Sequence, residues 1–142
     1  MKLTEQNFQN LISYWAGKLN LPLPLFRRDN GMKWLATIIY CKDCKAYSYC
    51  YNFKKTLELE ESEIAGAVFH ELGHIKYYKK RKNTIQSEYD AETFALRCLK
   101  KYYPDYVKYE IKGWKKLIKE KSWRKKYPDH AKAFDLIKEY QS

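Results

Sequence analysis

The sequence of 142 residues has little of what marks a secreted or membrane-spanning protein. No run of apolar residues approaches the roughly 20 that a transmembrane helix needs. The N-terminal stretch MKLTEQNFQNLISYW carries polar residues where a signal peptide needs an apolar segment. The absence of both signals predicts a cytoplasmic protein that does not associate with a membrane.

Cysteine and histidine are also scarce. The four cysteines, at positions 41, 44, 50 and 98, are too few and too irregularly spaced for the disulfide framework of a small secreted domain. A closed zinc site built on Cys41-x-x-Cys44 would need all four of them to converge. Packed or free thiols are expected at these positions, and a second metal site or a disulfide between two of the cysteines is the alternative. Only three histidines occur, and two of them are four residues apart.

Acidic residues are outnumbered by basic ones. The chain has 28 Lys and Arg against 17 Asp and Glu, which gives a formal net charge of +11. The basic residues gather in two stretches, 76–82 and 108–126. Solvated helix faces account for such stretches, and contact with nucleic acid is the alternative that the charge suggests.

The residue pattern predicts a single α+β domain over residues 1–142. The length suits one hydrophobic core, and no internal repeat or low-complexity linker divides the chain. Helical spacing of apolar residues predicts a helix over residues 4–19, which the prolines that follow would end. Residues 34–40 and 46–53 are predicted strands joined by a turn, with Tyr47, Tyr49, Tyr51 and Phe53 on one face. A short third strand is expected in the segment TLELE, residues 56–60.

Helices are predicted for the rest of the chain. They cover about residues 60–80 and 85–102, followed by two more between 105 and 141 that Pro128 separates. We expect a core over residues 4–103 and a helical C-terminal extension over residues 104–142. The simplest role of the extension is to complete the core. Partner binding and coverage of a cleft are the alternatives.

The stretch HELGH, residues 70–74, carries the clearest chemical signal. On a helix, His70 and His74 lie one turn apart and present two imidazoles on the same face, which is a common way to bind Zn²⁺. Glu71 is turned by about 100° from His70, so it can act on a water molecule at the metal without being a ligand. The flanking residues are apolar, and burial of two imidazoles without partners would be costly.

A catalytic zinc ion needs a third protein ligand, which the next predicted helix can supply. Glu88 and Glu92 are again four residues apart and share one helix face. A helical hairpin through KKRKNT would bring this face across the two histidines. We predict Glu88 as the third ligand and Glu92 as the acceptor for the free ring N–H of a ligand histidine, although the spacing alone also allows the reverse. Asp90 faces roughly the opposite way.

HELGH followed by ExxxE ahead of FAL resembles the gluzincin metallopeptidases, in particular the minigluzincins and the ImmA/IrrE-type soluble peptidases. The likeness covers about residues 57–99. It implies a zincin-like minimal gluzincin domain with an N-terminal helix, a small antiparallel sheet, an active-site helix and a glutamate helix. It also implies that His70, His74 and Glu88 bind one Zn²⁺ and that Glu71 is the general base. The later acidic residue is usually Asp in related sequences and is Glu92 here.

The sequence thus predicts a zinc-dependent metallopeptidase that acts on peptide or protein substrates. The substrate is expected to lie along residues 46–53 or the neighbouring strand, by β-augmentation. His130 is a candidate oxyanion stabiliser, but its place after Pro128 would also suit a helix cap or a solvent-exposed residue.

Two alternatives to a general peptidase remain. One is a nucleic-acid-associated regulatory protein with a zinc site and little or no general proteolytic activity. The other is a fold that the metal only stabilises. Peptide deformylases share HExxH, but their cysteine motif is absent from this sequence.

Overall fold

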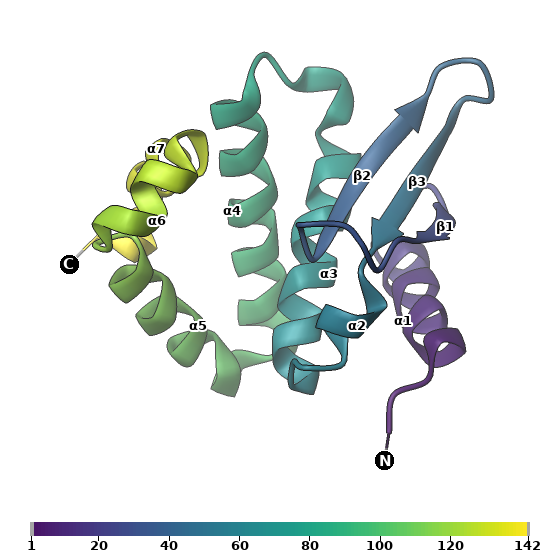
Figure 1. The fold of residues 1–142 in the computed structure, drawn as a ribbon, viewed down its shortest axis with the longest axis horizontal. Coiled ribbons are helices and arrows are strands. Elements are labelled where there is room, and N and C mark those ends of the chain that lie inside the picture. The colour runs from purple at the N-terminus through teal and green to yellow at the C-terminus, as the bar shows by residue number, and fades with distance from the viewer. Residues whose placement is uncertain (1, 142) are drawn as a thin grey trace.

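The computed structural model describes residues 2–141, which form seven α-helices and a three-stranded sheet. In chain order the elements are α1 (Glu5–Lys18), β1 (Leu25–Arg28), β2 (Ala36–Cys41), β3 (Ala46–Tyr51), α2 (Phe53–Thr56), α3 (Glu61–Lys76), α4 (Thr84–Tyr102), α5 (Pro104–Leu117), α6 (Lys121–Lys126) and α7 (Pro128–Asp135), with 3-10 turns at Tyr78–Lys80 and Lys138–Tyr140. Figure 1 shows α3 and α4 between the sheet with α1 on one side and α5 to α7 on the other. The predicted α+β class is confirmed. Within residues 2–141, no helix is long and apolar enough to cross a membrane.

Local signals set the start of the two central helices. At α3, the Glu63 side chain accepts a hydrogen bond from the Glu60 N–H at 3.1 Å, as part of a capping box. At α4, Asn83 Oδ1 accepts a hydrogen bond from the Gln86 N–H at 2.8 Å. Helix α4 matches the prediction for residues 85–102 closely. Helix α3 ends at Lys76 rather than near residue 80, because the chain tightens there into a 3-10 turn.

The sheet is mixed, so the prediction of an antiparallel sheet is wrong in part. Strands β2 and β3 are antiparallel and joined by the predicted turn, with Ile38 opposite Tyr49. Strand β1 pairs parallel to β3, with Leu25 opposite Ser48, and the strand order is β1-β3-β2. The third strand was expected in residues 56–60, but this segment ends α2 and turns into α3. The short β1, directly after two prolines, has no alternation that would reveal a strand.

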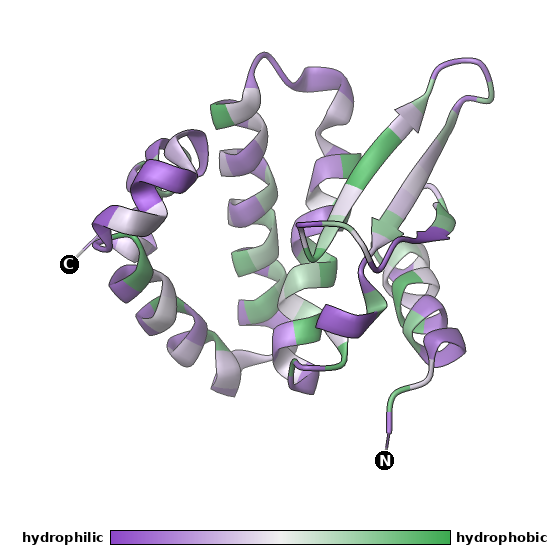
Figure 2. Cartoon of the chain, viewed as in Figure 1, coloured by the Kyte–Doolittle hydropathy of each residue, from purple (hydrophilic) through white to green (hydrophobic). Residues whose placement is uncertain are grey.

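One buried cluster joins all parts of the described chain. Tyr47, Tyr49 and Tyr51, which were predicted to share one face of the strand, are all buried, whereas Phe53 begins α2 instead of extending the strand. The C-terminal extension adds Val107, Ile118, Ala133, Phe134, Ile137 and Tyr140 to the same cluster. In Figure 2, much of the outer surface of α5 to α7 is purple, the colour of hydrophilic residues. The extension therefore completes the core, as expected for its simplest role.

The cysteines fall into two groups. Cys50 and Cys98 are free and buried, as predicted. Cys41 and Cys44 form a disulfide at the tip of the β2–β3 hairpin, so the prediction of packed or free thiols is wrong for this pair. The tight turn between them brings their Cα atoms to 5.5 Å, a separation that a disulfide can span.

Close packing of α3 against α4 depends on Gly73. A Cβ atom at this position would lie 2.9 Å from both the Cα and the carbonyl oxygen of Ala91 on α4. At Gly66, two turns earlier, a Cβ would meet its nearest neighbours, on Leu99 and Glu110, at 3.6 Å, which is an ordinary contact. Gly73 thus sets the separation of the two helices that carry the predicted metal ligands.

Candidate metal centre

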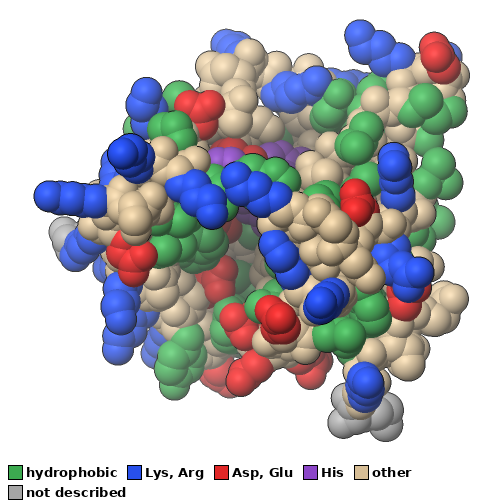
Figure 3. Space-filling model, viewed as in Figure 1, with side chains coloured by type: hydrophobic (Ala, Val, Ile, Leu, Met, Phe, Trp, Pro, Cys, Tyr) green, Lys and Arg blue, Asp and Glu red, His purple; other side chains and the backbone are tan. Residues whose placement is uncertain are grey.

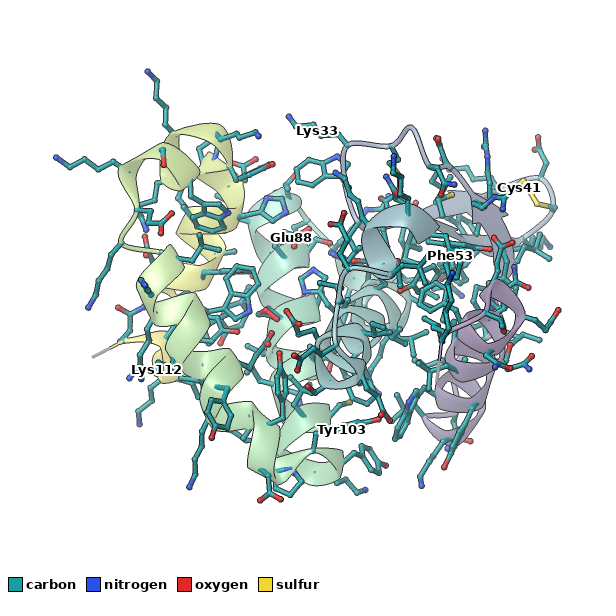
Figure 4. All side chains as sticks on the ribbon, turned by 60° about the horizontal axis from the view of Figure 1, so that its bottom comes forward. Lys33, Cys41, Phe53, Glu88, Tyr103 and Lys112 are labelled. Carbon is teal, nitrogen blue, oxygen red and sulfur yellow. A yellow bond between two sulfur atoms is a disulfide. The ribbon has the colours of Figure 1, made fainter. Side chains whose placement is uncertain are left out.

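Two histidines from α3 meet one carboxylate from α4. His70 Nε2 lies 3.0 Å from Glu88 Oε2, and His74 Nε2 lies 3.1 Å from Glu88 Oε1. All three side chains are largely buried, at 17%, 16% and 11% exposure. Figure 3 shows histidine side chains inside a hollow beside acidic side chains, and Figure 4 places Glu88 in the interior, between α3 and the C-terminal helices. The chain reversal between α3 and α4 therefore brings Glu88 across the histidine pair, as the spacing predicts.

The second ring nitrogen of each histidine also has a partner. His70 Nδ1 lies 3.6 Å from Glu92 Oε1, so Glu92 lies on the other side of this ring from Glu88. His74 Nδ1 lies 3.1 Å from Ser87 Oγ. A proton on His74 Nδ1 that is donated to Ser87 Oγ leaves Nε2 of this ring free to bind a metal. Sequence reasoning missed Ser87, whose only signal is its place directly before Glu88 in the first turn of α4.

Burial and charge oppose each other in this cluster. Burial disfavours the His70 cation, but the carboxylates of Glu88 and Glu92 outweigh it and raise the pKa of His70 well above its usual value. Burial alone would raise the pKa of Glu88, yet hydrogen bonds and charge from His70 and His74 hold this pKa well below its usual range. These opposite shifts favour an ion pair between His70 and Glu88.

Glu71 lies beside the same two rings. One of its carboxylate oxygens and one ring nitrogen from each histidine lie within 4.8 Å of one another. Burial raises the pKa of Glu71, although the charges of His70 and His74 lower it. A carboxyl group with a raised pKa is suited to take up and release a proton near neutral pH. Because both oxygens of Glu88 already face the Nε2 atoms, Glu88 fits the ligand position better and Glu71 fits that of a base.

The third histidine reaches the same carboxylate from the C-terminal extension. His130 Nε2, on α7, lies 3.5 Å from Glu88 Oε2. Its ring stacks on Trp34, with centroids 5.6 Å apart and planes inclined by 17°, and makes an edge contact with Tyr127. The sequence left open whether His130 faces solvent, caps a helix or belongs to the site, and the structure brings it to the site.

A cavity of about 800 Å³ opens beside these residues. Its walls come from the start of β2, from α3 and α4, and from the extension, with Trp34, Ala36, Thr37, Glu63, Gly66, Tyr106, Glu110, Trp114, Trp123 and Tyr127 among the lining residues. None of the described lining residues is Lys or Arg. The basic side chains of the two stretches therefore lie outside this cavity, although Tyr109, Glu110, Trp114 and Trp123 of the second stretch line it.

The structure also decides which strand could receive a substrate backbone. Of the two alternatives from the sequence, β3 is central and pairs on both sides, which leaves the neighbouring strand. Its neighbour β2 pairs only with β3 in the described part of the chain. Ala36 and Thr37 of β2 line the cavity, so its free edge is the one that a peptide can reach.

Two imidazole nitrogens and one carboxylate are a donor set that suits Zn²⁺. The pKa of His70 is raised, so at any pH below this pKa zinc must displace a proton from His70 in order to bind. We expect zinc affinity to increase with pH over about pH 6 to pH 8, by about tenfold per pH unit for each proton displaced. Competition titrations with a chromophoric chelator give the affinity, and calorimetry in buffers of different ionisation enthalpy counts the protons. Binding without proton release would contradict this expectation.

The likeness to gluzincins rests on the spacing of His70, Glu71, His74 and Glu88 and on the geometry that the fold gives them. Comparisons with known proteins add nothing to this likeness, which therefore remains a prediction. No protein-family model matches the chain, and no curated protein or solved structure matches it either.

Proposed function

We propose that this protein is a zinc-dependent metallopeptidase with a zincin-like minimal gluzincin fold, in which His70, His74 and Glu88 hold one Zn²⁺. The observation that carries the proposal is the convergence of both Nε2 atoms on Glu88, at 3.0 and 3.1 Å, in the wall of a large cavity. The order of N-terminal helix, small sheet, histidine helix and glutamate helix also agrees with this fold.

The residues around the cavity divide the work of peptide hydrolysis. Zinc, when bound, lowers the pKa of water to about 7 and polarises a carbonyl group. Glu71 takes the proton from the attacking water and delivers it to the leaving amine. His130 donates a hydrogen bond from Nε2 to the carbonyl oxygen as negative charge develops there. The edge of β2 holds the substrate backbone in an extended conformation.

The metal assignment is tested by replacing Glu88. We expect purified wild-type protein to hold about one zinc ion per chain, and Glu88→Ala to weaken zinc binding by about 100-fold or more, because loss of a ligand should cost at least as much as loss of a supporting residue. Asp90→Ala is the matched control, since Asp90 lies on the same helix but accepts a hydrogen bond from Gln86 instead. Metal content by plasma mass spectrometry and chelator competition measure both variants.

Two outcomes would count against the proposal. Zinc retention by Glu88→Ala equal to that of Asp90→Ala would show that Glu88 is not a ligand. If zinc-loaded wild-type protein cleaves a peptide library no faster than protein whose zinc has been removed with a chelator, the protein has a metal site but no general peptidase activity.

A nucleic-acid-associated role is the second candidate, and it concerns a different surface. Lys79, Arg81 and Lys82 line a separate hollow at the α3–α4 connection, together with Tyr40 and Tyr78. Basic and aromatic side chains together favour single-stranded nucleic acid. Binding of single-stranded nucleic acid with an affinity that falls steeply as the salt concentration rises would support this role. This role would not account for the metal site.

A further inference from the structure

The cavity beside the proposed metal centre is acidic, although the protein has a net charge of +11. Five glutamates line it: Glu63, Glu71, Glu88, Glu92 and Glu110. Three of them surround the histidines, and Glu63 belongs to the capping box of α3. Glu110, on α5, has neither role.

Neutral groups hold Glu110 in place without cancelling its charge. The Trp114 Nε1–H donates to Glu110 Oε1 at 2.9 Å, and the Tyr106 hydroxyl donates to Oε2. These donors lie one turn after and one turn before Glu110 on the same helix face. Among the described residues, no Lys, Arg or His forms an ion pair with Glu110. Lys108 and Lys112, on the same helix, are exposed.

The surroundings of Glu110 disfavour a negative charge that no cation balances. Burial raises the pKa of Glu110, and the charges of Glu92 and Glu63 raise it further, although the hydrogen bonds from Tyr106 and Trp114 lower it. Glu92 is itself only 3% exposed. A cation in the cavity would offset this concentration of negative charge.

The aromatic lining of the cavity suits a long cationic side chain. Tyr106, Tyr109 and Trp114 line the wall around Glu110. Aromatic faces stabilise an alkyl stem by apolar contact and a cationic head by the cation–π interaction. Glu110 and the histidines line the same cavity, so one peptide can contact both.

We propose that this cavity recognises a lysine or arginine side chain of the peptide substrate and that Glu110 is the residue that determines this specificity. The reaction in this inference rests on the proposed peptidase function, whereas the binding does not. An acidic side chain in the same place would face Glu110, Glu63 and Glu92 and be repelled.

Peptide binding tests recognition without hydrolysis. The probes are extended hexapeptides, acetylated at the N-terminus and amidated at the C-terminus, which differ only in one central Lys, norleucine or Glu. With zinc-loaded Glu71→Gln protein, we expect the Lys peptide to bind about 10-fold more tightly than the norleucine peptide, since one charge-assisted hydrogen bond supplies this factor. The Glu peptide should bind more weakly than both. Calorimetry, or the fluorescence of Trp114 and Trp123 in the cavity wall, measures the affinities.

A second substitution assigns the preference to Glu110. Glu110→Gln in the same background should reduce the Lys-to-norleucine ratio to about threefold or less, because the amide keeps the size of the side chain and removes its charge. Glu120→Gln is the control, since Glu120 is exposed and does not line the cavity. Zinc content and far-ultraviolet circular dichroism equal to those of the parent protein show that each variant is folded.

The outcomes separate this inference from the proposed function. Equal affinity for the Lys and norleucine peptides, or a ratio that Glu110→Gln leaves unchanged, would overturn the inference even if wild type hydrolyses peptides. A Lys preference that depends on Glu110, in a protein that hydrolyses none of the peptides, would support cation recognition and refute the peptidase.

Discussion

Glu71→Gln is expected to lower kcat for peptide hydrolysis by about 10²- to 10⁴-fold, because the amide cannot accept the proton of the attacking water. Zinc should remain bound, since His70, His74 and Glu88 are unchanged. Initial rates on a fluorogenic peptide library, with zinc content measured on the same samples, test both parts of the expectation. Glu61→Gln is the matched control, because Glu61 is exposed on the first turn of the same helix.

The two readouts distinguish three roles for Glu71. Loss of activity with retained zinc supports a base. Loss of zinc would mean that Glu71 is itself a ligand, which its position within 4.8 Å of a nitrogen on each ring makes a real alternative. Full activity of Glu71→Gln would mean that another residue is the general base, and His130 would be the next residue to replace.

Gly73→Ala is expected to lower the free energy of unfolding by about 1–3 kcal/mol, the usual cost of overpacking in a core. Its Cβ would come within 2.9 Å of the Ala91 backbone, which cannot move aside as a flexible side chain can. Gly66→Ala, on the same helix, should be neutral or stabilising by up to about 1 kcal/mol, because alanine favours helix and the nearest atoms are 3.6 Å away. Urea denaturation of the zinc-free proteins measures both.

The same pair of variants tests whether helix separation governs the metal centre. A wider gap between α3 and α4 would move Glu88 away from both rings, so Gly73→Ala should also weaken zinc binding, whereas Gly66→Ala should not. If Gly73→Ala matches Gly66→Ala in stability and zinc affinity, the approach of the two helices at Ala91 does not control the site.

Helical periodicity predicted the residues of the candidate site well because they come from two successive helices. Four-residue spacing places His70 with His74 and Glu88 with Glu92 on one face of each helix. The connection between the two helices is short, which favours packing of the second helix against the first. Spacing could not tell which of Glu88 and Glu92 lies nearer to the Nε2 atoms. In the structure Glu88 faces Nε2 of both rings and Glu92 faces Nδ1 of one.

Features that depend on distant parts of the chain could not be predicted in this way. The parallel pairing of Leu25 with Ser48 joins strands that are separated by a hairpin strand, and four residues are too few to show a period. The stacking of Trp34 on His130 spans most of the chain. Ser87 was missed because a hydroxyl has no spacing rule of its own. Glu110 was missed because its burial near Glu92 and Glu63 depends on how α5 packs against the rest of the chain.

The meeting of His130 with the α3 pair has a practical consequence. The chain contains only three histidines, and each has a ring nitrogen within 3.5 Å of Glu88. Every imidazole resonance in an NMR spectrum of this protein therefore arises at one place, with no background from elsewhere. Titration of a metal or a peptide can be followed on those few signals without isotope labelling or assignment of the remaining residues.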